Sequence, residues 1–527
     1  MPAPEELLRK YWGYTRFLPH QKEIIGSVLK KHDTVGIMAT GSGKSICYQV
    51  PAVALGGLTV VVSPLVSLMK DQADGLNGRG IPAAAYTGSL GFRAKEIIER
   101  DLKDNAVRIL FVSPEKCVQP GFLARLRELP VRLIAIDEAH CISAWGHDFR
   151  PEYRQLAVLK RSFSKVPVLA LTATAIPAVR KDIREQLGLS RPREFVGSFD
   201  RENLRYRVLE KHNPVVQLVE IAARHRGESG IVYCLSKNGT EEVAAELARR
   251  GFRALAYHAG LPGHVREKVQ DTFTTGSSVI VCATVAFGMG IDKPDVRFIV
   301  HYDVPKSIEG YYQETGRAGR DGKPAECVLL YSRADADRVR SLIEGDRTGG
   351  GNTRVALRKL GEMAAFCEAG GCRRKFLLGY FGQEYPGESC GSCDRCEDGQ
   401  GLFDGTEVAA SIIACVQQLP AGSGAGLVAD VLAGAQTAEI RKGGLDLLPA
   451  YGTGRSYRRN QYRAWVGELV RSGVLGREGG RGTGITLTEE SAAVSAGKLR
   501  VMLPLLSGSA KAKPKTRASR QPGAGSR

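Results

Sequence analysis

The stretch Thr34-Val-Gly-Ile-Met-Ala-Thr-Gly-Ser-Gly-Lys-Ser45 joins a short apolar run to a glycine-containing loop. The apolar half predicts a strand, and the residues after Ser45 predict a helix. Glycines let backbone N–H groups approach a phosphate at a helix N-terminus. In this arrangement Lys44 reaches the β- and γ-phosphates, and the Ser45 hydroxyl ligates magnesium. The stretch therefore predicts a strand–loop–helix unit that binds a nucleoside triphosphate.

The loop fits this pattern imperfectly. The pattern GxxxxGK[ST] requires a glycine where this chain has Met38, and a chance match in a flexible turn is the alternative. The predicted phosphate-binding residues are Thr40, Gly41, Ser42, Gly43, Lys44 and Ser45.

Continuous apolar runs recur on both sides of residue 200. The first series is Thr34–Met38, Leu58–Val62, Arg108–Val112, Leu133–Ile136 and Val168–Leu171. The second series is Gly230–Cys234, Ala254–Tyr257, Val279–Cys282, Phe298–Val300 and Cys327–Tyr331. Such runs, separated by helical patterns, are typical of a parallel sheet covered on both faces. We therefore predict two α/β domains in series.

Composition limits the possible compartments and partners. The chain has 527 residues and a net charge of +18, which favours a nucleic-acid partner over a role in solubility alone. No apolar run reaches the roughly 18 residues of a membrane span, and residues 1–6 lack the apolar core of a secretory signal. Cysteines scattered in apolar runs suit reduced thiols. We expect a cytoplasmic protein without membrane contacts, associated with the nucleoid if bacterial.

Two acids end the hydrophobic run before residue 137. Asp137 is placed to hold magnesium, and Glu138 to orient or deprotonate an attacking water. An exposed acidic pair on a turn is the alternative. Upstream, Gln21 could read an adenine edge and Tyr14 could stack on the base, although Pro19 could also simply mark a helix start.

The stretch Gln313-Glu-Thr-Gly-Arg-Ala-Gly-Arg320 presents two arginines from a glycine-punctuated turn. A fixed guanidinium neutralises charge that develops on a γ-phosphate during phosphoryl transfer. Arg317 and Arg320 are therefore candidate catalytic residues supplied by the second domain.

The segment Asp137-Glu-Ala-His-Cys-Ile-Ser-Ala-Trp-Gly-His-Asp-Phe-Arg-Pro-Glu-Tyr153 closely resembles the aromatic-rich loop of RecQ-family DNA helicases, which belong to superfamily 2. The resemblance extends from about Tyr14 to Leu487. It implies two RecA-like domains and ATP-driven unwinding of DNA in the 3′-to-5′ direction, with roles in recombination and repair. It also favours Arg320 as the arginine finger.

The resemblance assigns further residues. In the aromatic loop, Trp145 and Phe149 can stack on unpaired bases, at roughly 1–3 kcal/mol each. An aromatic cluster can also be core, but the interleaved polar residues do not suit a core strand. The expected DNA contacts of the loop are Trp145, His147, Phe149 and Arg150. The remaining nucleotide-coupling residues implied by the family are Thr172, Thr174, Gly288, Gly290, Asp292 and Gln313.

The chain departs from the family pattern at three positions. Leu18 replaces an arginine and His20 a glycine in the adenine motif, where Arg16 could compensate. Ala144 stands where the aromatic loop usually has a glutamine, so one polar contact of the DNA sensor is expected to be missing.

Four cysteines have the spacing of a structural zinc site. Cys372 is followed by Cys390, Cys393 and Cys396, and four thiolates suit tetrahedral zinc. The four thiolates then fill the coordination sphere, so the metal would stabilise the fold and would take no part in catalysis. We expect Cys367 to pack.

Residues 405 to 500 resemble the family's winged-helix domain. Arg455, Arg458 and Arg459 lie in a basic, aromatic segment and could grip duplex phosphates; a solvated basic face is the alternative. The expected wing, around residues 477–484, has no aromatic tip. No HRDC module is expected.

The expected organisation is an ATP-binding RecA-like domain at 1–200, a second at 201–340, a helical zinc-binding domain at 341–402, a winged helix at 403–505 and a disordered basic tail at 506–527. The expected cofactors are ATP, Mg²⁺ and one structural Zn²⁺. The expected partners are single-stranded and duplex or branched DNA, with a single-strand-binding protein as a further candidate, and the sequence demands no dimer, so we expect a monomer. The alternatives are an RNA helicase, a non-unwinding duplex translocase or a DNA-binding or annealing scaffold.

Overall fold

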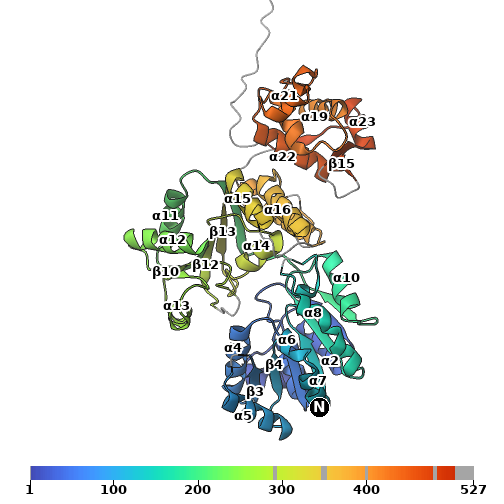
Figure 1. Ribbon diagram of the computed structural model, residues 1–527. Helices are drawn as coiled ribbons and strands as arrows, with labels where there is room; N and C mark the ends of the chain where they lie inside the picture. The colour runs from blue at the N-terminus through green and yellow to red at the C-terminus, as the bar shows by residue number, and fades with distance from the viewer. Residues whose placement is uncertain are drawn as a thin grey trace, which may run out of the picture. The chain divides into compact units, whose positions relative to one another are not determined.

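The computed structural model describes residues 2–88, 90–146, 148–288, 293–345, 353–387, 389–397, 402–478 and 484–504. The chain divides into two compact units, one formed by residues 1–367 with 373–394 and the other by residues 368–372 with 395–527. The larger unit contains both parallel sheets that the sequence predicts (Figure 1).

The first sheet has seven parallel strands in the order β3-β4-β2-β5-β6-β1-β7. Its strands are β1 Thr34–Ile37, β2 Leu58–Val62, β3 Ala83–Tyr86, β4 Ile109–Val112, β5 Val131–Ile136, β6 Val168–Thr172 and β7 Arg193–Val196. The central strands β1, β2, β4 and β6 are buried at every residue, which explains their continuous apolar runs.

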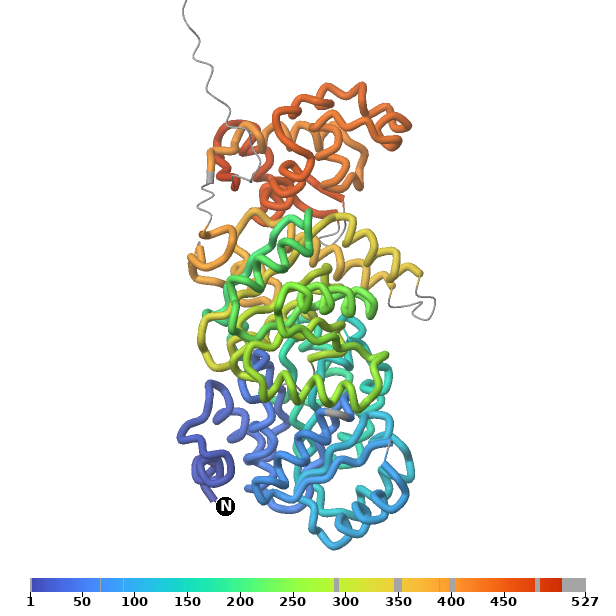
Figure 2. Tube along the Cα trace, turned by 90° about the vertical axis from the view of Figure 1, so that its left-hand side faces the viewer, coloured from blue at the N-terminus to red at the C-terminus, as the bar shows by residue number. Residues whose placement is uncertain are grey.

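Helices cover this sheet, and the N-terminal helix packs on them. The helices are α1 Pro4–Trp12, α2 Gln21–Leu29, α3 Ile46–Leu55, α4 Val66–Asn77, α5 Phe92–Lys103, α6 Pro114–Cys117, α7 Pro120–Arg127, α8 Pro151–Gln155, α9 Ala157–Ser162 and α10 Pro177–Gln186, with the 3-10 turn η1 Ala139–Ile142. Leu7 and Leu8 of α1 join a cluster with Ile25, Ile46 and Val50, so the dark blue chain end belongs to this domain (Figure 2).

The second sheet has six parallel strands in the order β10-β11-β9-β12-β13-β8. Its strands are β8 Leu204–Glu210, β9 Ser229–Tyr233, β10 Ala254–Tyr257, β11 Ile280–Ala283, β12 Val296–His301 and β13 Ala325–Tyr331. Its helices are α11 Pro214–Arg224, α12 Lys237–Arg249, α13 Gly263–Thr275, α14 Ile308–Thr315 and α15 Arg333–Gly345, and α16 Thr353–Glu368, α17 Arg373–Tyr380 and α18 Asp394–Glu397 follow. The prediction of two tandem parallel-sheet domains is confirmed.

The smaller unit is mainly helical and closes with short antiparallel pairs. Its elements are β14 Leu402–Asp404, α19 Thr406–Gln418, α20 Ala425–Leu432, α21 Ala438–Lys442, η2 Leu445–Leu447, α22 Arg459–Arg471, β15 Leu475–Arg477, β16 Ile485–Leu487, α23 Glu489–Ser495 and β17 Met502–Pro504. β15 pairs with β16 and β14 with β17. Trp465 is buried at the centre, and its Nε1 donates to the Pro504 carbonyl at 3.0 Å. This helical core with a short hairpin agrees with the expected winged helix, whose tip at 479–483 lies outside the described residues.

None of the described helices has the length and apolar character that a bilayer crossing requires.

Candidate active site

The predicted phosphate loop lies between β1 and α3, as the sequence indicates. Gly41 and Gly43 have φ values of +83° and +70°, in the left-handed region that glycine adopts without strain. The Ser42 backbone N–H donates to the Ala39 carbonyl at 3.2 Å, which closes the turn. Lys44 Nζ lies 3.5 Å from the Met38 carbonyl, folded back over the loop. The loop geometry therefore suits phosphate binding at the start of α3.

Met38 fits at the position where the pattern has glycine because its side chain enters the core. It is 2% exposed, and its sulfur accepts a hydrogen bond from the Cys47 thiol at 3.7 Å. Met38 is absent from the positive-φ residues of the described chain, so its backbone needs no glycine. The departure from the pattern is therefore compatible with the loop.

The two acids follow β5 at the carboxyl end of the first sheet. Burial, together with the neighbouring Glu138 carboxylate, raises the pKa of Asp137 to about 7. Asp137 Oδ1 accepts from the Glu138 backbone N–H at 3.0 Å, and Glu138 has a φ of +47°. A glutamate in the left-handed region is strained, and such strain clusters at functional sites. A divalent cation at Asp137 would offset the cost of its buried charge.

A polar path leads from these acids toward the second sheet. His140 Nδ1 lies 3.2 Å from Glu138 Oε2 and 2.8 Å from Thr172 Oγ1. The Thr174 backbone N–H donates to Thr172 Oγ1 at 3.3 Å, and Gln313 Nε2 donates to Thr174 Oγ1 at 3.3 Å. Both threonines are buried and both belong to the path, as expected for the coupling role that the resemblance implies.

The two candidate catalytic arginines of the second domain, Arg317 and Arg320, have different surroundings. Arg317 is 8% exposed and donates to the Gly288 carbonyl within its own domain. A Cβ atom placed on Gly41 would lie 3.3 Å from Arg320 Cγ, so Arg320 lies against the phosphate loop. The geometry favours Arg320 over Arg317 as the residue nearest to a bound γ-phosphate. Gly290 and Asp292 lie outside the described residues.

Gln21 contacts the phosphate loop rather than an open pocket. Its amide donates to the Ser42 and Gly43 carbonyls at 3.1 and 3.0 Å, and its Oε1 accepts from the Leu18 backbone N–H at 2.9 Å. Reading an adenine edge would require exchanging these partners. Tyr14 is 59% exposed, so its ring is open to solvent.

A cavity of about 1140 Å³ adjoins this segment and is lined by residues that include Arg16, Leu18, His20 and Phe195. Arg16, the candidate substitute for the missing arginine, thus lines the same cavity as Leu18. His20 has a φ of +65°. That value explains why glycine suits this position, and it places a modest strain on the histidine.

In the aromatic loop, arginines cover both rings. The Arg358 guanidinium, from α16, lies 5.0 Å from the Trp145 ring centre, and that of Arg154 lies 4.9 Å from the Phe149 ring centre. Sequence reasoning missed both arginines. For Arg358 no spacing signal exists, because it lies more than 200 residues from the loop. His147 lies outside the described residues.

Arg150 and Gly146 shape this loop. Arg150 donates twice to Asp148 Oδ2, at 3.3 and 3.1 Å, and once to the Pro64 carbonyl at 3.1 Å, so phosphate binding would compete with these bonds. A Cβ atom on Gly146 would lie 2.7 Å from the His140 carbonyl oxygen. The loop backbone therefore packs directly on the residue that joins Glu138 to Thr172.

The four predicted zinc ligands come together. The sulfur atoms of Cys372, Cys390, Cys393 and Cys396 all lie within 4.8 Å of one another. Zn–S bonds of about 2.3 Å place tetrahedral sulfurs about 3.8 Å apart, so the donor set fits zinc. Cys367 is buried outside the cluster.

A buried ion pair braces this region. Arg373 is fully buried and donates from Nε and Nη2 to the two carboxylate oxygens of Asp394, both at 3.0 Å. The pair joins the starts of α17 and α18, next in sequence to two of the cysteines.

The three arginines predicted to bind DNA in the smaller unit, Arg455, Arg458 and Arg459, are exposed. Arg459 is engaged, because its Nε donates to Asp430 Oδ1 at 2.5 Å. Arg458 is the N-cap residue of α22. Arg455 packs its guanidinium beside Gly434 and Gly452. Arg455 and Arg458 are therefore the more available for phosphate.

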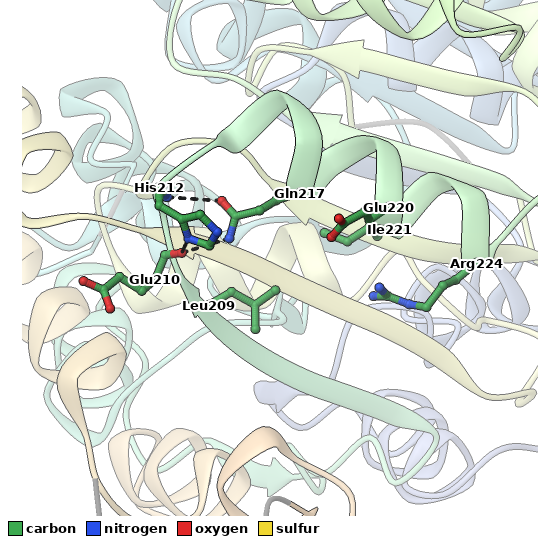
Figure 3. A pocket seen from close by; sticks show the side chains of 7 residues that line it. All are labelled: Leu209, Glu210, His212, Gln217, Glu220, Ile221 and Arg224. Atoms are coloured by element: carbon green, nitrogen blue, oxygen red, sulfur yellow. Dashed lines mark hydrogen bonds between the residues drawn. The ribbon is translucent and has the colours of Figure 1, made fainter. Parts of the chain in front are cut away.

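A separate hollow of about 340 Å³ lies between β8 and α11 and is lined by Leu209, Glu210, His212, Gln217, Glu220, Ile221 and Arg224 (Figure 3). Its polar groups satisfy one another: Gln217 accepts from the His212 backbone N–H and donates to the Glu210 carbonyl. We assign no ligand to it.

Four family models match the chain in succession. They are a DEAD/DEAH box helicase domain at residues 18–183, a helicase conserved C-terminal domain at 210–322, a RecQ zinc-binding domain at 333–397 and an RQC domain at 400–512.

Curated relatives match most of the chain. The chain is 42% identical over 470 residues to the ATP-dependent DNA helicase RecQ of Pasteurella multocida, covering 89% of this chain and 74% of that protein. It is 41% identical over 452 residues to the protein of the same name from Bacillus subtilis, covering 85% and 76%.

Solved helicases share the fold. The DEAD-box helicase Mss116 bound to single-stranded RNA matches with a TM-score of 0.54 at 17% identity, covering 71% of this chain and 89% of that chain. The helicase MrfA bound to DNA matches with a TM-score of 0.53 at 16% identity, covering 76% and 62%.

Proposed function

The chain belongs to the RecQ family of ATP-dependent DNA helicases, and from this premise we propose that it moves 3′-to-5′ along single-stranded DNA and unwinds duplex or branched substrates in recombination and repair. The observation that carries the proposal is the approach of Arg320, from the second domain, to the phosphate loop of the first. A nucleotide between them would be contacted by both domains, so its hydrolysis would change how the domains hold each other.

For ATP hydrolysis we propose the following roles. Lys44 binds the β- and γ-phosphates, Glu138 orients the attacking water, and Arg320 neutralises charge on the γ-phosphate. Ser45 and Asp137 would hold Mg²⁺, which would balance phosphate charge when bound. The raised pKa of Asp137 supports this assignment, because a buried carboxylate without a cation is costly.

For DNA sensing we propose that unpaired bases stack on Trp145 and Phe149. The loop backbone packs on His140, the residue that links Glu138 to Thr172 in the polar path. A base that moves the loop would therefore move the group that holds Glu138. This supports hydrolysis that depends on DNA.

The outer parts of the chain take supporting roles in this proposal. The helices at 341–402 carry Zn²⁺, which the four-cysteine cluster and the zinc-binding family model support. The winged helix at 403–505 would contact duplex phosphates through Arg455 and Arg458. We propose a monomer that works at the nucleoid or in the cytoplasm, where a single-strand-binding protein would share its substrate.

Strand displacement on a 3′-tailed DNA duplex tests the function. The wild type is expected to displace the strand only with ATP and Mg²⁺, and Lys44→Ala is expected to lose at least 100-fold in DNA-stimulated hydrolysis. Lys165→Ala, which removes an exposed lysine of the same domain, is the matched control and should retain full activity.

The alternatives give different results in the same assay. Stimulation by RNA rather than DNA would indicate an RNA helicase. DNA-stimulated hydrolysis without displacement would indicate a translocase on duplex DNA, and DNA binding without hydrolysis would indicate a scaffold.

A further inference from the structure

The connection between the two sheets contains an arginine whose side chain contacts both domains. β7 ends at Val196 and β8 begins at Leu204, and Arg201 lies in the segment between them. Its guanidinium makes four hydrogen bonds, all to main-chain carbonyl oxygens.

One acceptor belongs to the phosphate loop and three belong to the turn that carries the catalytic arginines. Arg201 Nη1 donates to the carbonyls of Thr40 at 3.1 Å and Gly316 at 3.2 Å. Arg201 Nη2 donates to the carbonyls of Ala318 at 2.9 Å and Gly319 at 3.0 Å. These three carbonyls flank Arg317 and immediately precede Arg320 in the chain.

The two backbones that Arg201 joins lie close together. A Cβ atom on Gly316 would lie 2.8 Å from the Thr40 Cβ, a distance that real side chains do not reach. A Cβ atom on Gly41 would lie 3.6 Å from Arg201 Nη1, and Arg320 Cγ is its nearest neighbour at 3.3 Å. Arg201 and Arg320 thus share one small space beside the phosphate loop.

Arg201 is itself held in place by α17. Arg374 is 4% exposed and donates to the carbonyls of Arg201 and Leu204, both at 2.8 Å. It also pairs with the Asp200 carboxylate. Arg374 therefore holds the backbone on either side of Arg201 in place, so less conformational entropy is lost when the guanidinium forms its hydrogen bonds.

We propose that Arg201 is a positioning residue for ATP hydrolysis: it fixes the backbone of residues 316–319 against the phosphate loop and thereby sets where Arg320 stands relative to the γ-phosphate. The inference rests on the function proposed above and adds a residue that lies between the two matched helicase models, at 18–183 and 210–322. Arginine suits the task because its planar fork binds several oxygens in fixed directions, whereas a lysine ammonium is a point charge on a flexible stem.

Steady-state hydrolysis by Arg201→Ala, with saturating single-stranded DNA, tests the proposal. The kcat is expected to fall 10- to 100-fold while KM for ATP and the affinity for a fluorescent ADP analogue stay within 3-fold. Such a division between kcat and KM marks the loss of an interaction needed for catalysis rather than for nucleotide binding. Arg201→Lys is expected to remain at least 5-fold slower than the wild type, because one ammonium cannot span both domains.

A double variant tests whether Arg201 acts through Arg320. If it does, Arg201→Ala combined with Arg320→Ala should be no slower than Arg320→Ala alone, since coupled residues are not additive. Asn203→Ala is the matched control: it removes bonds to the Gly319 and Lys323 carbonyls, both 2.8 Å and both within the second domain, and should keep kcat within 3-fold.

The outcomes separate the two claims. Wild-type kcat in Arg201→Ala or Arg201→Lys, or full additivity with Arg320→Ala, would overturn the positioning role while leaving the helicase function intact. A loss of kcat in Asn203→Ala equal to that in Arg201→Ala would also overturn it, because holding the Gly319 backbone within the second domain would then account for the whole effect. Absence of DNA-stimulated hydrolysis in the wild type would overturn both. If Arg201→Ala fails to fold, Arg201→Lys carries the decision.

Discussion

Replacing Arg358 with alanine should strengthen the binding of single-stranded DNA, although the change removes a positive charge. The Arg358 guanidinium lies 5.0 Å from the centre of the Trp145 ring, and we expect a stacking base to compete for the same face of the ring. Trp145 is 44% exposed, so the cation–π contact belongs to the weak, exposed class of about 0.5–1 kcal/mol. The paired carboxylate, Glu362, is 3.7 Å from Arg358 and adds little.

A base that stacks on this face must first displace the guanidinium. Removing the competitor should therefore tighten binding by the same 0.5–1 kcal/mol, or about 2- to 5-fold in Kd. Fluorescence anisotropy with a labelled oligonucleotide at fixed salt measures the change. A Trp145→Ala background should abolish the gain, because the gain is transmitted through that ring.

Arg354→Ala is the matched control, since Arg354 is an exposed arginine one turn earlier on α16. It also loses one charge, so its effect should be neutral or a slight weakening. If Arg358→Ala weakens binding more than Arg354→Ala does, Arg358 assists the base from the opposite face of the ring, and competition between the guanidinium and the base is refuted.

Three further predictions concern the loop, the metal and pH. Gly146→Ala should reduce DNA stimulation of hydrolysis at least 10-fold, with hydrolysis without DNA within 3-fold, because the added Cβ would lie 2.7 Å from a carbonyl oxygen; stimulation at the wild-type level would contradict the role of the loop. Removing zinc with a chelator at neutral pH should lower the melting temperature, and re-addition of Zn²⁺ should restore it; an unchanged melting curve in a sample shown to be metal-free would argue against a structural metal. Hydrogen bonds and ion pairs with His225 and neighbouring arginines outweigh the burial of Glu326 and lower its pKa to about 2. The ionised Glu326 therefore contributes, at most, of order 3 kcal/mol to the free energy of unfolding above the unfolded pKa of about 4.5, and this contribution is lost as the pH falls toward 2. Glu326→Gln should flatten this acid dependence of stability, and an acid profile identical to the wild type would contradict the assignment.

The sequence predicts the buried strands well, because full burial on both faces of a parallel sheet requires continuous apolar runs. Within the two parallel sheets it misses three strands, for physical reasons. β3 is Ala83-Ala-Ala-Tyr86, whose alanines have little strand preference. β7 is an exposed edge strand, and β8 alternates arginines with buried residues.

The candidate site is predictable where chemistry dictates residue type, as for the phosphate loop, the two acids and the cysteines. It is not predictable where one side chain has several possible hydrogen-bond partners. The Gln21 amide contacts main-chain carbonyls of the phosphate loop, and Arg150 is engaged with Asp148. Neither choice follows from spacing, because each depends on how distant segments meet in the folded chain.

All four acceptors of Arg201 are peptide carbonyls, so these hydrogen bonds do not use the side-chain chemistry of Thr40, Gly316, Ala318 or Gly319. No particular side chain at the acceptor residues therefore marks this contact in the sequence. No side-chain change at the acceptor residues could compensate for a substitution at Arg201. Correlated variation between homologues would therefore not identify the contact. Contacts of this kind are found from coordinates alone. In this chain one of them connects the two domains whose relative movement the proposed helicase activity requires.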